Sequence, residues 1–192
     1  SLVLASLRFT SRRDEGDNEK LFPMLVVEEP EAHLHPALQY RLLKFVREQL
    51  EQSEDRVEGS RQVFMTSHST HVTAAAGLDA LVCLVAENDG TVRPAYPGRV
   101  FAAGDEQRSK RYVERYLDAT KSNMLFSKGV LLVEGIAEQH LAPCFADYLG
   151  RPFENNFAAV IAVDGLCFKH FLPLFGASED PDCRTAALPR RV

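Results

Sequence analysis

The chain has 192 residues, of which 45% are hydrophobic and 26% charged, and its formal net charge is −5. This composition is typical of an ordinary soluble globular protein, and the charge argues neither for nor against a nucleic-acid partner. No apolar stretch reaches the roughly 18–20 residues that span a bilayer, and the amino terminus has no secretory-signal pattern, so we expect a cytoplasmic protein without a membrane segment. Four scattered cysteines without a CxxC pair favour reduced thiols over a disulfide framework or a zinc site.

Residues 1–10 have helical apolar spacing, and residues 12–20 predict a charged loop. An apolar run at 24–27 then ends in two adjacent carboxylates, Glu28 and Glu29. A short apolar run before a breaker predicts a strand buried on both faces of a parallel sheet. Its acidic end would lie at the carboxyl edge of the sheet, where α/β proteins bind ligands. One carboxylate there could hold hydrated magnesium while its neighbour polarises a water, as in a Walker B segment.

An amphipathic helix is predicted at 38–50 and a second strand at 63–66, which closes on a Ser-His-Ser tripeptide centred on His68. A phosphoryl-transfer site needs a metal ligand, a water-polarising base and a γ-phosphate sensor at neighbouring strand ends. The order of strand, paired acids, helix, strand and histidine supplies three such groups. Glu28, Glu29 and His68 are therefore the candidate residues of an ATP site.

Other interpretations of these residues remain open. Glu28 and Glu29 could lie at a helix N-terminus, where the helix dipole favours carboxylates. His68, taken alone, could be a hydrogen-bonded structural histidine. His33 and His35 could form a metal-binding HxH pair, although no third ligand is evident.

A third strand is predicted at 80–86, and the Asn-Asp-Gly turn at 88–90 predicts a hairpin into 91–93. The segment 93–104 holds two prolines and two glycines and is the best domain boundary, followed by a helix at 106–117. Residues 108–128 carry a local excess of four positive charges, which could be a solvated helix face or a phosphate-contacting surface. The charged residues are Arg108, Lys110, Arg111, Arg115, Lys121 and Lys128 against Glu114 and Asp118.

A second α/β unit follows, with strands at 129–133 and 157–163 and helices at 137–149 and 168–175. Strand–helix–strand order implies parallel strands with right-handed crossovers. The first strand delivers Glu134, a glycine allows a turn, and Glu138 follows in the first helical turn. Two such carboxylates suit magnesium or manganese, which are hard ions that bind phosphates.

The segment EEPEAHLHP at 28–36 resembles the Walker B and D-loop of the SMC-like and OLD-like branch of ABC-type ATPases, and TSHS at 66–69 resembles its histidine switch. The resemblance implies that Glu28 is the magnesium-side acid, Glu29 the catalytic base and His68 the γ-phosphate sensor. Most of the superfamily has aspartate at the position of Glu28. No GxxxxGK[ST] phosphate loop occurs in the sequence, so we expect a fragment whose phosphate loop lies upstream.

The segment GVLLVEGIAE at 129–138 resembles the first motif of the Toprim fold, and after an ATPase of this type it resembles the OLD family of endonucleases. The resemblance implies that Glu134 is catalytic and that Glu138 is a second metal ligand. Asp164 could approach the metal or form a turn. Asp180 and Asp182 have the letters of the DxD motif but lie in a predicted loop, so we expect the true motif beyond the chain.

The expected fold class is α/β: the C-terminal part of an ABC/SMC-like P-loop ATPase fold, followed by the start of a Rossmann-like Toprim domain. The expected domains are an ATPase lobe at 1–104, a basic connecting helix at 105–127 and a Toprim part at 128–192. The resemblance implies an ATP-linked DNA endonuclease that uses Mg²⁺ or Mn²⁺, acts in phage defence and forms a homodimer or higher homo-oligomer through the ATPase part, with a helicase-like or other defence partner. The alternatives are a non-nucleolytic SMC-like ATPase whose Toprim-like part binds DNA or a partner, and a primase- or topoisomerase-like enzyme.

Overall fold

The structure, a computed structural model, describes residues 24–54, 62–87 and 89–189. The chain divides into two compact units, residues 1–75 and 76–192. The helix predicted at 1–10, the charged loop at 12–20 and the first residue of the predicted 88–90 turn lie outside the described residues. In the described ranges, no helix combines the length and the apolar character needed to cross a membrane.

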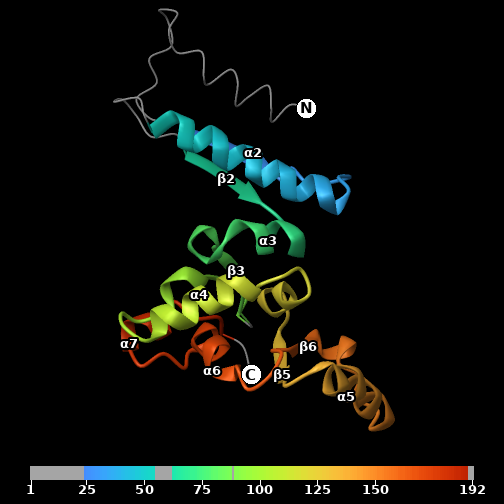
Figure 1. Cartoon of the computed structure of the whole chain (residues 1–192). Helices are drawn as coiled ribbons and strands as arrows, with labels where there is room; N and C mark the ends of the chain where they lie inside the picture. Colours follow the sequence, from blue (N-terminus) through green and yellow to red (C-terminus); the bar gives the residue numbers. More distant parts are fainter. Residues whose placement is uncertain (1–23, 55–61, 88, 190–192) are drawn as a thin grey trace, which may run out of the picture. The chain divides into compact units, whose positions relative to one another are not determined.

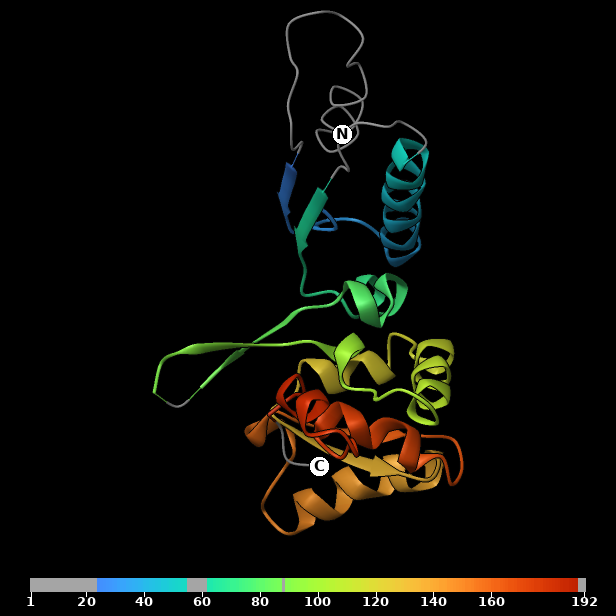
Figure 2. The ribbon, with the colours of Figure 1, turned by 90° about the vertical axis from the view of Figure 1, so that its left-hand side faces the viewer.

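The first unit contains a pair of parallel strands. Its elements are β1 (Met24–Glu28), α2 (Pro36–Glu54), β2 (Gln62–Thr66) and α3 (Thr70–Ala76). Met24 lies opposite Gln62, and Glu28 lies opposite Thr66 at the carboxyl end of the pair. Figure 2 shows the two strands side by side, with α2 running alongside them. The predicted parallel arrangement is confirmed, and it brings the residues after β1 next to those after β2.

The predicted burial of β1 on both faces is wrong for the described structure. Exposed and half-buried residues alternate along both strands, and the side chains of Met24, Val26 and Phe64 are 59%, 68% and 53% exposed. Alternation of this kind means that one face of the pair is covered and the other is not. In the described part of the unit, α2 contributes Leu43 and Val46 to the buried set.

The second unit contains an antiparallel hairpin, which extends to the left in Figure 2, and a second parallel pair, which lies toward the bottom of Figure 1. Its strands are β3 (Cys83–Ala86), β4 (Val92–Ala95), β5 (Gly129–Val133) and β6 (Ala158–Ala162). Its α-helices are α4 (Glu106–Tyr116), α5 (Ile136–Tyr148), α6 (Phe168–Phe171) and α7 (Pro181–Thr185). Short 3₁₀ helices lie at η1 (Leu78–Ala80), η2 (Pro97–Arg99), η3 (Lys121–Leu125), η4 (Glu154–Asn156) and η5 (Leu172–Phe175).

The β3–β4 hairpin confirms the predicted turn. Asp89 accepts hydrogen bonds from the backbone N–H and the hydroxyl of Thr91 at 2.9 and 2.6 Å, and Gly90 has a φ of 85°. An aspartate that bonds to the backbone two residues onward, followed by a glycine at positive φ, is a turn signal with a physical cause.

Strands β5 and β6 are parallel, with Gly129 opposite Ala158 and Val133 opposite Ala162. They are joined through α5, which packs on the pair, as expected for a strand–helix–strand crossover. The core of this unit joins the hairpin, the two strands and the helices that follow them. Its fully buried members are Leu78, Ala95, Val100, Val113, Met124, Ile161, Val163, Phe171 and Leu174.

Two helical assignments differ from the sequence-based expectation. Residues 181–185 form α7 rather than a loop, with Asp180 as its N-cap and proline in the first turn. Helix α3 was not predicted, because its sequence THVTAAA combines β-branched residues with no apolar period. The Ser69 hydroxyl accepts hydrogen bonds from the N–H groups of His71 and Val72 at its start, and such a cap stabilises a helix that propensity alone does not favour.

Candidate functional sites at two strand edges

The first candidate site lies where β1 and β2 end. Glu28 is the last residue of β1, and the backbone N–H of Glu29 donates to both the carbonyl and the hydroxyl oxygen of Thr66, at 3.1 and 3.2 Å. These bonds fasten the turn after β1 to the end of β2. Glu29 has a φ of 41°, a left-handed conformation that is costly for a residue with a side chain.

His68 lies against Glu29. Its Nε2 is 3.1 Å from Oε1 of Glu29, and the two side chains are 85% and 46% exposed. The structure therefore brings together the predicted catalytic base and the predicted phosphate sensor from neighbouring strand ends. Because both groups are exposed, their contact adds little to stability, and both can be reached by a ligand.

The turn after Glu29 contains a buried residue that the sequence did not single out. Glu31 is only 6% exposed, and its Oε1 accepts a short hydrogen bond from the hydroxyl of Ser67. Its Oε2 is buried and has no hydrogen-bond partner among the described residues. Glu31 and Ser67 both lie in the segments that resemble ATPase motifs, but the sequence suggests that a glutamate after a proline in a turn is exposed to solvent.

The two histidines of the HxH pair lie in the turn before α2 and at its end, and the His35 side chain accepts a backbone hydrogen bond. His33 has a φ of 66° within the turn, and Nδ1 of His35 accepts a 3.3 Å hydrogen bond from the N–H of Ala37 at the start of α2. Within the described ranges, no group of three or more histidine, cysteine or acidic side chains is arranged to hold a metal ion.

The second candidate site lies where β5 and β6 end. Glu134 directly follows β5 and is exposed. The N–H of Gly165, after β6, donates to the carbonyl oxygen of Glu134 at 2.9 Å. Gly135 is the N-cap of α5, and its N–H donates to Oε2 of Glu138 at 3.2 Å. Both predicted metal ligands thus lie within one turn of the strand end, with Glu138 also capping the helix.

Asp164 forms the predicted turn. It has a φ of 59°, and Gly165 follows at 110°. Its Oδ2 accepts from Nζ of Lys121 at 2.7 Å, so the Asp164 carboxylate already has a cationic partner at the same sheet edge. The lysine is a residue that the sequence offered only as one of six basic positions.

The acids of the Asp-Pro-Asp segment have a structural role. Oδ1 of Asp180 accepts from the N–H of Asp182 at 2.9 Å, which caps α7. This is the hydrogen bond of an N-cap aspartate.

Several of the basic residues at 108–128 have partners within the chain. Lys110 pairs with Asp79, and Lys121 pairs with Asp164 and Asp118. Lys128 lies over the ring of Phe157 at 4.9 Å. A cation that is already paired is less available to a phosphate, so these contacts favour a structural interpretation for part of the charge excess.

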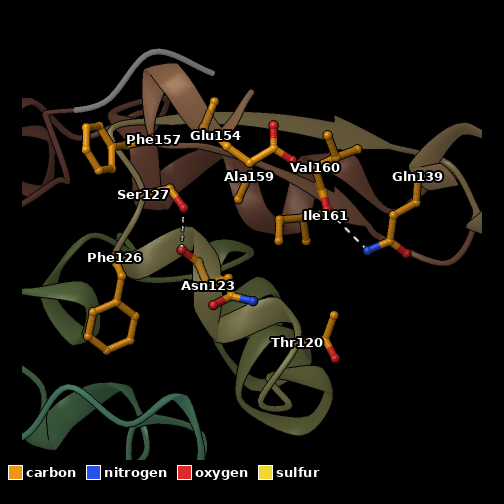
Figure 3. Close-up of a pocket in the computed structure, with 11 residues that line it drawn as sticks. Thr120, Asn123, Phe126, Ser127, Gln139, Glu154, Phe157, Ala159, Val160 and Ile161 are labelled. Carbon is orange, nitrogen blue, oxygen red and sulfur yellow. Dashed lines mark hydrogen bonds between the residues drawn. The ribbon is translucent and has the colours of Figure 1, made fainter. Parts of the chain in front are cut away.

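A cavity of about 450 Å³ lies along β6 and is lined by η3, by β6 and by Gln139 of α5. Figure 3 shows the Gln139 amide pointing to the strand, where it donates to the carbonyl oxygen of Val160 at 3.2 Å. Neither Glu134 nor Glu138 lines the cavity. The candidate carboxylates therefore lie on an open sheet edge rather than in this hollow.

Comparison with protein families gives two matches along the chain. Residues 1–73 match the family described as AAA ATPase domain, a range that includes Glu28, Glu29 and His68. Residues 125–182 match the family described as overcoming lysogenization defect protein-like, TOPRIM domain, a range that includes Glu134, Glu138 and Asp164. No curated protein matches the chain.

Proposed function

From a chain that joins part of an AAA ATPase domain to an OLD-like Toprim domain, we propose an ATP-linked DNA endonuclease that depends on a divalent metal. The observation that carries this proposal is the placement of Glu134 at the end of β5, beside the Gly165 turn, in the range that matches the Toprim family. Carboxyl ends of parallel strands are where α/β folds bind ligands. DNA is the proposed substrate, and phage defence is the proposed setting.

Glu134 and Glu138 fit a divalent ion by the chemistry of their donor atoms. Both present carboxylate oxygens at the start of α5, and magnesium is commonly held by one or two carboxylates together with water and substrate phosphates. Such an ion would supply Lewis-acid stabilisation of a phosphate oxygen and a more acidic water. Glu134 is exposed, and its carboxylate makes no hydrogen bond or ion pair with the described residues, so it is the better proposed ligand and catalytic residue. Glu138 can contribute its other oxygen while it caps the helix.

For the ATPase part, we propose that Glu29 orients and deprotonates the attacking water and that His68 senses the γ-phosphate. Their 3.1 Å contact supports this pairing, because a base and a sensor must act on the same phosphate. Glu28 is the proposed magnesium-side acid. ATP binding also needs a phosphate loop. We propose that the protein forms a homodimer or higher homo-oligomer through its ATPase part. A helicase or another defence protein is the proposed partner. ATP and DNA are both substrates inside the cell, so the proposed setting is the cytoplasm.

Nicking of supercoiled plasmid with Mg²⁺ or Mn²⁺ by the protein in its full natural length tests the nuclease. Glu134→Ala should lower cleavage by on the order of 100-fold. Asp147→Ala, which removes an exposed carboxylate at the far end of the same helix, is the matched control and should cleave normally. Unchanged cleavage by Glu134→Ala would refute the role of this residue.

A second candidate function is a non-nucleolytic ATPase whose Toprim-like part binds DNA or a partner. It is favoured by the structural engagement of two acids near Glu134, since Glu138 caps α5 and Asp164 pairs with Lys121. The same plasmid experiment separates the two functions. A protein with this second function should bind DNA in a mobility-shift assay but should not nick the plasmid at any metal concentration.

A further inference from the structure

The strongest unexplained feature of the first unit is the burial of Glu31. One of its carboxylate oxygens receives a hydrogen bond from Ser67, and the other is buried without a partner among the described residues. A buried polar group left unpaired lowers stability, and more so if it is charged. Among the described residues, the Glu31 carboxylate bonds to the Ser67 hydroxyl, so we expect any effect of Glu31 on its surroundings to pass through that hydroxyl.

That hydroxyl belongs to the residue before His68. Ser67 donates to Glu31 and accepts from the N–H of Ser69 at 3.0 Å, so its position is fixed from two directions. Ser69, on the other side of His68, has its own anchor, because its hydroxyl donates to Oε1 of Gln39 at 2.6 Å. The loop that carries His68 is therefore fastened at both flanking serines.

The His68 ring itself is loosely held. Its side chain is 85% exposed, and among the described residues its Nε2 approaches Oε1 of Glu29 at 3.1 Å. Its direction must then come from the backbone on which it stands. Glu29 and Glu31 belong to the same turn, so one turn supplies both the carboxylate that faces His68 and the carboxylate that fixes the loop.

We propose that Glu31 is a positioning residue, which sets the His68 ring against Glu29 by holding the Ser67 hydroxyl. This inference rests on the proposed ATPase function for its biological meaning, but the contact that it concerns exists without nucleotide. It predicts that removing the Glu31 carboxylate changes the surroundings of the His68 ring, although the Glu31 carboxylate bonds to Ser67 and the ring faces Glu29.

NMR of the ring carbons and protons in chain labelled at histidine tests the proposal. His68→Gln assigns the His68 signals, and Glu29→Ala gives their position when the facing carboxylate is absent. Glu31→Ala and Ser67→Ala should each move the His68 signals toward those of Glu29→Ala. Glu31→Gln should leave them in place, because its amide oxygen can still accept from Ser67. Glu48→Ala, on the exposed side of α2, is the control and should change nothing.

Unmoved His68 signals in both Glu31→Ala and Ser67→Ala, even with a lower melting temperature, would overturn the proposal and leave Glu31 a structural residue. If Glu31→Ala does not fold, Ser67→Ala alone decides. The readout needs no ATP, so failure of the proposed ATPase activity and failure of this positioning role are separate results. If the activity is present, the full-length protein should lose kcat in Glu31→Ala at least tenfold while KM for ATP stays the same, with recovery in Glu31→Gln.

Discussion

Lys121 and Asp164 form an ion pair across 43 residues of sequence, with 2.7 Å between Nζ and Oδ2. The lysine side chain is only 11% exposed, and its Nζ also lies 3.6 Å from Oδ2 of Asp118. The pair joins the start of η3 to the turn after β6, which is the turn that bonds to Glu134. The geometry of the proposed metal site at the ends of β5 and β6 thus depends on Lys121, which precedes both strands in the sequence.

Replacing Lys121 by methionine keeps the buried stem and removes the charge. We expect the free energy of unfolding to fall by about 1–2 kcal/mol, because Asp164 loses its partner but remains solvated. Chemical denaturation measures the change. Lys169→Met removes an exposed lysine and should alter stability by less than about 0.5 kcal/mol.

The Lys121 contribution should also depend on pH. Burial acts to lower the pKa of Lys121, but the hydrogen bond that Lys121 donates to Asp164 and the charges of Asp118 and Asp164 outweigh it and raise the pKa. A raised pKa in the folded state gives stability that is complete below the unfolded value and is lost as pH rises through the folded value. The difference in stability between wild type and Lys121→Met should therefore shrink above about pH 10.4; a difference that grows there would contradict the ion pair.

Glu106 should set part of the acid limit of stability. Burial acts to raise its pKa, but hydrogen bonds from the Ser178 hydroxyl and the N–H groups of Ala102 and Glu179 outweigh it and lower the pKa. A lowered carboxyl pKa gives stability that is present above the unfolded value and is lost as pH falls through the folded value.

Glu106→Gln should therefore lower stability at pH 7 by about 1–2 kcal/mol and converge with wild type in strong acid. Urea titrations across pH 2–7 measure this. Glu114→Gln, on the exposed side of the same helix, should track the wild type throughout. Parallel curves for wild type and Glu106→Gln would argue against the hydrogen-bonded carboxylate.

Gly98 should not tolerate a methyl group. A Cβ there would lie 2.5 Å from Oδ1 and 2.7 Å from Cα of Asp79, and 2.9 Å from the carbonyl oxygen of Leu78. Backbone atoms cannot move aside cheaply, so Gly98→Ala should cost about 1–3 kcal/mol. Gly129→Ala, whose Cβ would make only a 3.6 Å contact with Ala158, is the matched control. Equal melting temperatures for the two variants would refute the close approach.

Glu29→Gln tests the proposed ATPase base. We expect ATP turnover by the full-length protein to fall roughly 10²–10⁴-fold, with nucleotide binding retained. Because the His68 contact is exposed, the melting temperature should stay close to that of wild type. Normal turnover would remove Glu29 from the role of base, and Glu48→Gln should behave as wild type in both measurements.

The sequence predicted the local elements better than their surroundings. Strand periods and turn residues were sufficient for β5, β6 and the hairpin, because these signals are local. The N-cap and proline of α7 were also present in the sequence, but residues 180–182 were predicted to form a loop. Local signals can therefore miss a short helix such as α7, because aspartate and proline are also typical of loops.

The burial of Glu31 and Lys121 could not be predicted in this way. Each depends on a partner far along the chain, 36 residues away for the Glu31–Ser67 bond and 43 for the Lys121–Asp164 pair. Hydropathy treats both residues as solvated, and only the folded arrangement of neighbouring strand ends gives them partners. The exposed face of β1 could not be predicted for the same reason, because an apolar run does not show whether other elements cover one or both of its faces.

The backbone at Glu29 has a consequence for anyone who tries to stabilise this protein. A φ of 41° is tolerated more easily by glycine than by glutamate, and relief of such strain can be worth about 1 kcal/mol. A selection for heat resistance alone would therefore favour replacing Glu29 by glycine and would discard the carboxylate that faces His68. At this position, a more durable molecule and a working one require different amino acids.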